Sequence, residues 1–327
     1  MSQNGIGRIR IMGIAAQPTF GSPATTASYV LPLTNAPQIQ TKVNKAMNEA
    51  ALGSAYKEND VVNTTRFSTI PLEFKVDEDH LPLLLKQRFT IATTTTTEAT
   101  AYSHALTYSN NTNTYYTLFM QDDNLQDFIV KDCLFDNLNF TFDKDFVRVS
   151  ASVVGSYPTA SDVTNAVVQP KEFVGRMVSY LDDDVPGTAT ASTMLSLQLN
   201  MDFGLNDEST RFGLGDDDLA VLKLTSDKFM ASLERLKSDL NYYNDNEAGT
   251  MKQFQIVAQS LDRFVGSTTS TRPSITVTAP RAKIENLTEQ ADLENLTKEK
   301  VDLTLLKPAG VSGTPLSFTI VNAITSY

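Results

Sequence analysis

The chain has no tryptophan, one cysteine and two histidines among its 327 residues. The single cysteine, Cys133, excludes an intrachain disulfide framework and most zinc sites, because both need several sulfur or imidazole groups. Neither His80 nor His104 lies in a recognisable catalytic triad or metal-ligand motif. We therefore expect no enzymatic activity, no cofactor and no structural metal.

A basic excess is also absent. The formal net charge is −11, from 38 acidic and 27 basic residues, and no cluster of basic residues stands out. Proteins that grip nucleic acid by its phosphates need such a cluster. The acidic runs at 182–184 and 216–218 do not continue into a calcium-binding loop, so they are interpreted as solvated loops.

Long apolar runs are missing as well. The stretch Ile11 to Ala16 is too short for the apolar part of a signal peptide, and no span approaches the length of a transmembrane helix. We expect a protein that folds in a cytoplasm without contact to a membrane.

What the chain does contain is period-two alternation of apolar and polar residues, which is typical of half-buried β-strands. It occurs at 70–76, 138–142, 147–153, 195–203 and 301–305. The second and third of these segments are separated by a short polar turn and predict a hairpin.

Two segments 149 positions apart resemble each other, namely 135–139 (FDNLN) and 284–288 (IENLT). A Leu-Glu pair also recurs before each expected helix, at 72–73 and 233–234. The spacing is nearly half the chain, so we expect two related β-domains in tandem, at 1–160 and 161–327, joined near 156–170.

Helices are expected at 77–88, where Leu81, Leu84 and Leu85 would pack against a sheet, and at 238–244. The segment 32–63 does not alternate and has no evident counterpart in the second half, which suggests a functional arm. Within it, Val43, Met47, Ala50 and Ala51 could form a short amphipathic helix.

The order of these features resembles the major tail tube proteins of long-tailed (siphovirus-type) bacteriophages, in the type with a duplicated tube domain. Four pieces carry the resemblance: a strand leading into a leucine-rich helix at 70–86, a strand start at 102–107, a central hairpin at 132–155, and the closing strands at 279–284, 301–306 and 318–324. The expected second helix departs from this pattern because it lacks the leucine stripe of the first.

The resemblance implies antiparallel β-sandwich domains, each with a short flanking helix, that close into a β-barrel ring on oligomerisation. It further implies a structural virion protein whose stacked rings form a hollow tube that conducts phage DNA into the host. Three chains would make a pseudo-sixfold ring, and a homohexamer is the alternative. Implied partners are the tape measure protein, tail terminator or tip proteins, and genomic DNA in transit without specific binding. The expected location is the virion tail, after assembly in the host cytoplasm.

Candidate site residues follow from strand parity and from the arm. The expected lumen-facing residues are Asn137, Asn139, Thr141, Asp143, Asp202 and Asp302, and the arm residues Val43, Met47, Ala50 and Ala51 are expected to contribute to ring stacking. The alternative function is a carbohydrate-binding or adhesion module of β-sandwich type. Such modules commonly use exposed aromatic side chains, and the only close aromatic pairs here are 115–116 and 242–243.

Overall fold

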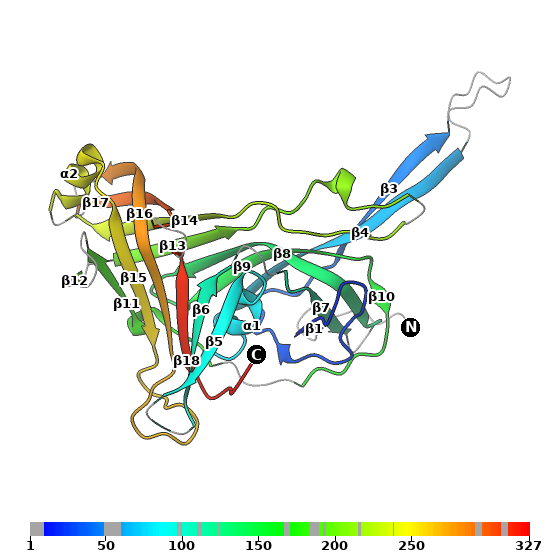
Figure 1. The fold of residues 1–327 in the computed structure, drawn as a ribbon, viewed down its shortest axis with the longest axis horizontal. Helices are drawn as coiled ribbons and strands as arrows, with labels where there is room; N and C mark the ends of the chain where they lie inside the picture. The colour runs from blue at the N-terminus through cyan, green and yellow to red at the C-terminus, as the bar shows by residue number, and fades with distance from the viewer. Residues whose placement is uncertain are drawn as a thin grey trace.

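A computed structural model describes residues 10–48, 60–96, 98, 100–109, 113–122, 125–166, 171–183, 190–191, 194–214, 217–237, 239–291, 296–308 and 313–327 (Figure 1). The described residues are mainly antiparallel β-structure, which confirms the fold class predicted from the alternation and is consistent with a β-sandwich. Among them, no helix has the length and apolar character that crossing a membrane requires.

In the first half, the residues that the structure describes form ten strands and one α-helix. They are β1 (Arg10–Ala16), β2 (Tyr29–Val30), β3 (Gln40–Asn48), β4 (Asp60–Lys75), α1 (Leu81–Leu85), β5 (Phe89–Thr95), β6 (Tyr102–Tyr108), β7 (Tyr116–Asp122), β8 (Phe128–Phe142), β9 (Arg148–Gly155) and β10 (Thr159–Ala160).

The described residues of the second half form eight strands, one longer α-helix and two short 3-10 helices, at Gly175–Met177 and Glu208–Thr210. The strands and the α-helix are β11 (Val178–Asp183), β12 (Thr190–Ala191), β13 (Met194–Asp202), β14 (Lys228–Leu236), α2 (Asn241–Ala248), β15 (Lys252–Gln259), β16 (Ser274–Gln290), β17 (Lys298–Leu305) and β18 (Ser317–Asn322).

The strand pairings of the two halves follow one scheme. In the first half, β1 pairs with β2 and β7, β3 with β4, β4 with β9, β7 with β8, and β8 with β9 and β10. In the second half, β11 pairs with β12 and β15, β13 with β14, β14 with β17, β15 with β16, and β16 with β17 and β18. The hairpin β5–β6 has no described counterpart between α2 and β15.

Eight strands form one continuous sheet in the order β3-β4-β9-β8-β13-β14-β17-β16, which we call the long sheet. Its alternating apolar side chains point into a hydrophobic core shared by both halves. For example, Phe318 of the second half lies edge-on to Phe89 of the first, with ring centroids 5.3 Å apart. One prediction fails at the start of β13, where a register shift between Met194 and Ser196 takes Leu195 out of the buried alternation.

Two of the long strands, β8 and β16, each belong to two sheets. The first part of β8 pairs with β7 and β10, and its last part lies in the long sheet between β9 and β13. In the same way, the first part of β16 pairs with β15 and β18, and its last part with β17. The sheet that contains β15, β16 and β18 continues through β6 to β5 of the first half (Figure 1).

Both helices differ from their predicted bounds. The helix expected at 77–88 is confined to Leu81–Leu85, and its N-cap is His80 rather than an aspartate. All five of its residues, including Leu81, Leu84 and Leu85, are buried. The helix expected at 238–244 runs from Asn241 to Ala248 and ends at Gly249, whose φ of 67° is a conformation that glycine adopts at little cost.

The arm contains a β-hairpin where the sequence suggested a helix. Val43 lies in β3, as does Met47, and β3 pairs along its length with β4. The hairpin extends away from the rest of the protein (Figure 1). Its exposed side chains lack the alternation of a half-buried strand, which explains why the sequence pattern missed it. Ala50 and Ala51 lie outside the described residues.

Candidate functional site

The long sheet has one face on the core and one polar face, made of the alternate side chains that point away from the core. Of the six residues predicted to line a lumen, Asn137, Asn139 and Thr141 lie on the polar face in β8, Asp202 in β13 and Asp302 in β17, and Asp143 directly follows β8. The strand register places Asn137 opposite Asp202, and Asn139 opposite Asn200. Asp302 lies opposite Ser232, whose hydroxyl donates a hydrogen bond of 2.6 Å to it.

Several charged side chains on the polar face are paired with one another. Arg148 lies 3.2 Å from Asp143 and 3.9 Å from Glu73, across neighbouring strands. Lys298 lies 3.2 Å from Glu234, and Lys300 3.7 Å from Asp302. Exposed pairs of this kind contribute little to stability, but they cancel much of each other's field. The polar face therefore offers a phosphate chain neither a strong attraction nor a strong repulsion.

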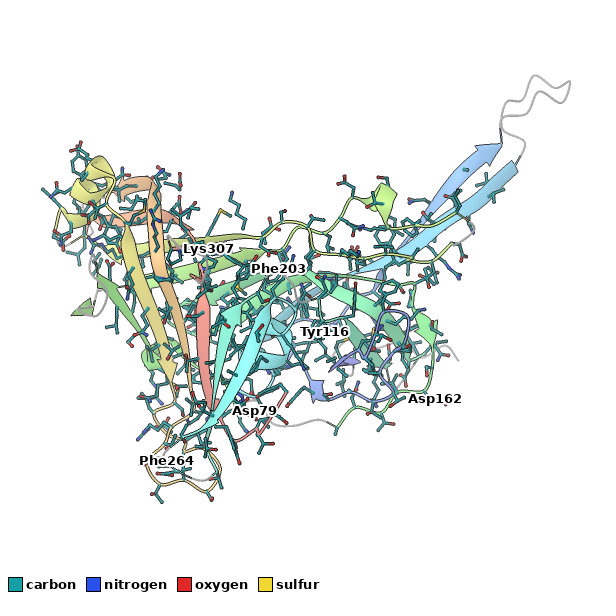
Figure 2. The ribbon with its side chains drawn as sticks, viewed as in Figure 1. Asp79, Tyr116, Asp162, Phe203, Phe264 and Lys307 are labelled. Atoms are coloured by element: carbon teal, nitrogen blue, oxygen red, sulfur yellow. The ribbon has the colours of Figure 1, made fainter. Side chains whose placement is uncertain are left out.

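The two halves of the chain meet edge to edge in the long sheet, through β8 and β13. Six residues of each strand pair, from Phe142 opposite Leu197 to Asn137 opposite Asp202. The N–H of Phe203, labelled in Figure 2, extends this pairing by donating a hydrogen bond of 2.9 Å to the carbonyl of Asp136. We call this set of contacts the inner junction.

A second connection between the halves lies in the other sheet, where β18 pairs with β6. Close to it, the guanidinium of Arg88 lies 3.2 Å from Asp227, and both side chains are almost fully buried. The hydroxyl of Tyr108 donates a short hydrogen bond to the same carboxylate, and burial together with this carboxylate raises the pKa of Tyr108. The sequence gives no sign of this arrangement, because its members lie 139 positions apart.

Two edges of the long sheet have no strand partner in the part of the chain that the structure describes. At one end, β3 pairs only with β4. At the other end, residues 283–290 of β16 pair only with β17. An unpaired strand edge presents a row of backbone donors and acceptors and readily accepts another strand. The sequence analysis named Val43 and Met47 of β3 as ring-stacking residues, but it predicted neither edge as a site of strand pairing.

The base of the arm rests on the connection between β13 and β14. Lys42 of the arm lies 2.7 Å from Glu208, and Arg66 lies 3.2 Å from Asp217. The rings of Phe67 and Phe212 contact each other with centroids 6.1 Å apart. Residues of the second half thus hold the base of the hairpin.

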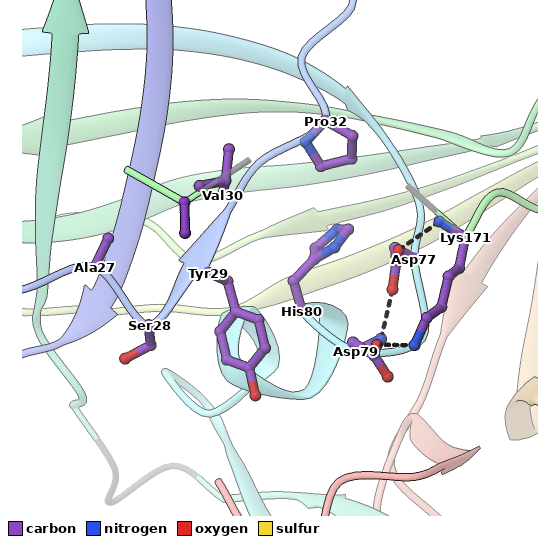
Figure 3. Close-up of a pocket in the computed structure, with 10 residues that line it drawn as sticks. Ala27, Ser28, Tyr29, Val30, Pro32, Asp77, Asp79, His80 and Lys171 are labelled. Atoms are coloured by element: carbon purple, nitrogen blue, oxygen red, sulfur yellow. Dashed lines mark hydrogen bonds and ion pairs between the residues drawn. The ribbon is translucent and has the colours of Figure 1, made fainter. Parts of the chain in front are cut away.

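A cavity of about 230 Å³ lies beside α1 (Figure 3). Tyr29, His80 and Lys171 line it together with Asp77 and Asp79. Asp77, Asp79 and the neighbouring Glu78 form a carboxylate group close enough to hold a cation. Protein cations already neutralise much of this charge, because Lys171 forms an ion pair with Asp79, and Arg263 lies 2.6 Å from Glu78.

Both histidines and the cysteine are enclosed by other side chains. Burial lowers the pKa of His80, although Asp77 and Asp79 oppose the shift. His104 lies 3.0 Å from the side chain of Asn322, and burial lowers its pKa as well. Burial raises the pKa of the Cys133 thiol, which disfavours the reactive thiolate.

Comparisons of the sequence with models of known protein families and with curated proteins found no match.

Proposed function

We propose that this chain is the major tail tube subunit of a long-tailed bacteriophage, and that it consists of two tandem tube domains. The observation that carries the proposal is the inner junction. It joins the four-strand unit β3-β4-β9-β8 edge to edge with the corresponding unit β13-β14-β17-β16. A four-strand unit that pairs edge to edge with its counterpart within one chain can pair in the same way with a unit of another chain.

Closure of such a sheet into a ring would remove its two unpaired edges, which are otherwise sites of uncontrolled association. Three chains with two units each give a pseudo-sixfold ring, and six chains remain the alternative. We assign residues 1–160 to the first domain and 161–327 to the second. The matching pairing schemes of the two halves support this division.

The polar face lines the channel in this proposal. The ion pairs of Arg148, Lys298 and Lys300 support a role in which phage DNA passes without specific binding, because each of these three cations has a nearby carboxylate that competes with phosphate. The β3–β4 arm would contact the next ring, and the tape measure and the terminator or tip proteins would set the length and ends of the tube. The protein would then reside in the virion tail.

Electron microscopy tests the proposal directly. Negatively stained samples of the purified protein over a concentration and salt series should contain rings or hollow tubes, with threefold or sixfold character in averaged end-on views. Monomeric particles in every condition, also after addition of tail completion proteins, would contradict the proposal. Monomers that bind specifically to a glycan array would instead support an adhesion module.

A further inference from the structure

The two unpaired edges of the long sheet correspond to the two strands of the inner junction. β3 occupies the position in the first half that β13 occupies in the second, because each is paired with the strand before the helix. The last part of β16 likewise corresponds to the last part of β8, because each forms a hairpin with the strand that follows. The inner junction is therefore a template for contact between two copies.

The strand registers define this correspondence residue by residue. In the first half, Leu72 lies opposite Ala151, which lies opposite Leu138. In the second half, Leu233 lies opposite Val301, which lies opposite Leu287. Leu138 and Leu287 are also the matching leucines of the repeated sequence segments. The sequence repeat and the strand pairing thus give the same alignment of the two halves, over three neighbouring strands in each.

The alignment extends to the edge strand. Lys42 lies opposite Phe67, just as Asp202 lies opposite Lys228 at the matching place. Lys42 therefore corresponds to Asp202, and Asn286 corresponds to Asn137. In the inner junction, Asp202 lies opposite Asn137.

We infer that β3 of one copy pairs antiparallel with the last part of β16 of a second copy, with Lys42 opposite Asn286, Thr41 opposite Leu287 and Gln40 opposite Thr288. This inference rests on the proposed tube function and names the partner strand of its ring contact. The N–H of Val43 would donate to the carbonyl of Glu285, as that of Phe203 does to Asp136 in the inner junction.

The chemistry of the two edges fits this pairing. β3 contains Lys42 and Lys45 and no carboxylate, whereas residues 283–290 contain Glu285 and Glu289 and one cation, Lys283. Within one chain Lys42 already pairs with Glu208, Glu285 with Lys283 and Glu289 with Lys237, so this difference in charge contributes little to the pairing. Near these edges, Ile39 and Leu287 are apolar side chains that are only partly buried against the core. A second copy would cover both of them, which adds a hydrophobic contribution to the backbone hydrogen bonds.

The contact between copies is more polar than the inner junction. In the inner junction, Leu138 and Phe140 lie opposite Met201 and Leu199, and all four are fully buried. At the corresponding places between copies, Leu287 faces Thr41, and Glu289 faces Ile39. The contact between copies is thus the weaker of the two, so rings should dissociate into intact chains.

Engineered disulfides test the register. Lys42→Cys combined with Asn286→Cys places thiols on residues that are directly opposite in the inferred pairing, at a distance that a disulfide can span. Gln40→Cys combined with Asn286→Cys is the off-register control, because residues displaced by two positions lie roughly 7–8 Å apart, beyond a disulfide's usual reach. Cys133 is retained because it is buried and its thiol pKa is raised.

The matched positive control is Asn137→Cys with Asp202→Cys, which occupy the corresponding opposite positions within one chain. After mild oxidation of assembled protein, the Lys42/Asn286 pair should give disulfide-linked multimers in non-reducing electrophoresis. The positive control should give an internally linked monomer, and the off-register pair should give no linked multimer. A series of linked species that stops at the trimer would identify a ring of three chains.

The outcomes separate the two proposals. Rings visible by electron microscopy in which only the off-register pair links, or in which neither pair links while the positive control does, would overturn the inferred register and leave the tube function standing. Absence of rings in the wild-type protein under every condition would overturn the tube function and this inference with it.

Discussion

Asp136 and Glu285, which lie 149 positions apart, are the extra residues of two β-bulges at matching places. The register between β8 and β9 shifts between Phe135 and Asn137, and that between β16 and β17 shifts between Ile284 and Asn286. A bulge bends its strand and increases the local twist. Each bulge lies in a strand, β8 or β16, that leaves one sheet and enters the long sheet. In both halves, therefore, a bulge bends the strand that passes between the two sheets.

The first prediction concerns Leu84, which anchors α1 and is 0% exposed. Leu84→Ala should lower the free energy of unfolding by about 2–5 kcal/mol, because it leaves a cavity in a packed core. Urea denaturation followed by circular dichroism measures this change. Leu125→Ala, at a side chain that is 59% exposed, is the matched control and should change stability by less than about 0.5 kcal/mol. Equal effects of the two substitutions would refute the anchoring role.

The second prediction concerns the buried pair of Arg88 and Asp227, which connects the two halves. Asp227→Asn should destabilise the protein by about 3–5 kcal/mol, since it leaves the guanidinium buried without its counter-charge. Adding Arg88→Met should restore part of the loss, because the double variant contains no uncompensated charge. A double-mutant cycle in urea measures the coupling, and strictly additive losses would show that the pair acts as two independent groups.

The third prediction concerns the pH dependence of stability. Burial raises the pKa of Glu78 from 4.5 to about 7, although Arg263, with nitrogens 2.6 and 3.3 Å from its carboxylate, opposes the shift. A raised pKa in the folded state means that the folded protein holds the proton more tightly than the unfolded chain. The stabilising contribution is therefore complete below pH 4.5 and is lost as the pH rises through 7.

The free energy of unfolding of the wild type should accordingly fall relative to that of Glu78→Gln, by on the order of 3 kcal/mol between pH 4.5 and 8. Thermal or urea unfolding over this pH range gives both curves. Their difference removes the contributions of His80 and His104, which both proteins share. Parallel curves would contradict the raised pKa and show that the Arg263 contact fully offsets the effect of burial on Glu78.

The fourth prediction concerns Asp132, a buried residue with a φ of 56° in β8. Its carboxylate accepts hydrogen bonds from the Gln17 side chain and the Gly21 N–H, both at 2.5 Å, and from the Ser156 hydroxyl at 3.1 Å. Asp132→Ala should cost about 2–4 kcal/mol, because these buried donors lose their acceptor. Asp132→Asn keeps an oxygen in place and should cost less. Equal losses for the two variants in urea unfolding would contradict this account.

Much of the long sheet was predictable from sequence, because its strands are half buried and their alternation records which side chains meet the core. Residues 70–75 of the segment 70–76, and the whole of 138–142 and 301–305, lie in strands of this sheet. The β3–β4 arm was not predictable in this way. Val61 and Val62 are 50% and 55% exposed, so in the arm no buried face imposes a period of two.

The ion pairs between side chains on neighbouring strands also could not be predicted from the sequence. The pairing of Arg148 with Asp143 and Glu73 depends on the register of three strands, which single-strand patterns do not contain.

The second helix, α2, lacks a leucine stripe, and Tyr242 takes the anchoring role there. Its ring is buried and its hydroxyl donates a hydrogen bond of 2.5 Å to Asp182, which lies in β11 rather than in the solvated loop predicted for it.

The paired charges of the polar face bear on how a long polyanion would move over it. A surface with isolated lysines would hold such a chain in deep, separated energy wells and release it in steps. A surface on which cations are matched by carboxylates, as Arg148, Lys298 and Lys300 are here, presents shallower wells. Transit along it would then be smooth, with a speed that depends on the driving pressure and on drag from the surrounding water, and only weakly on ionic strength.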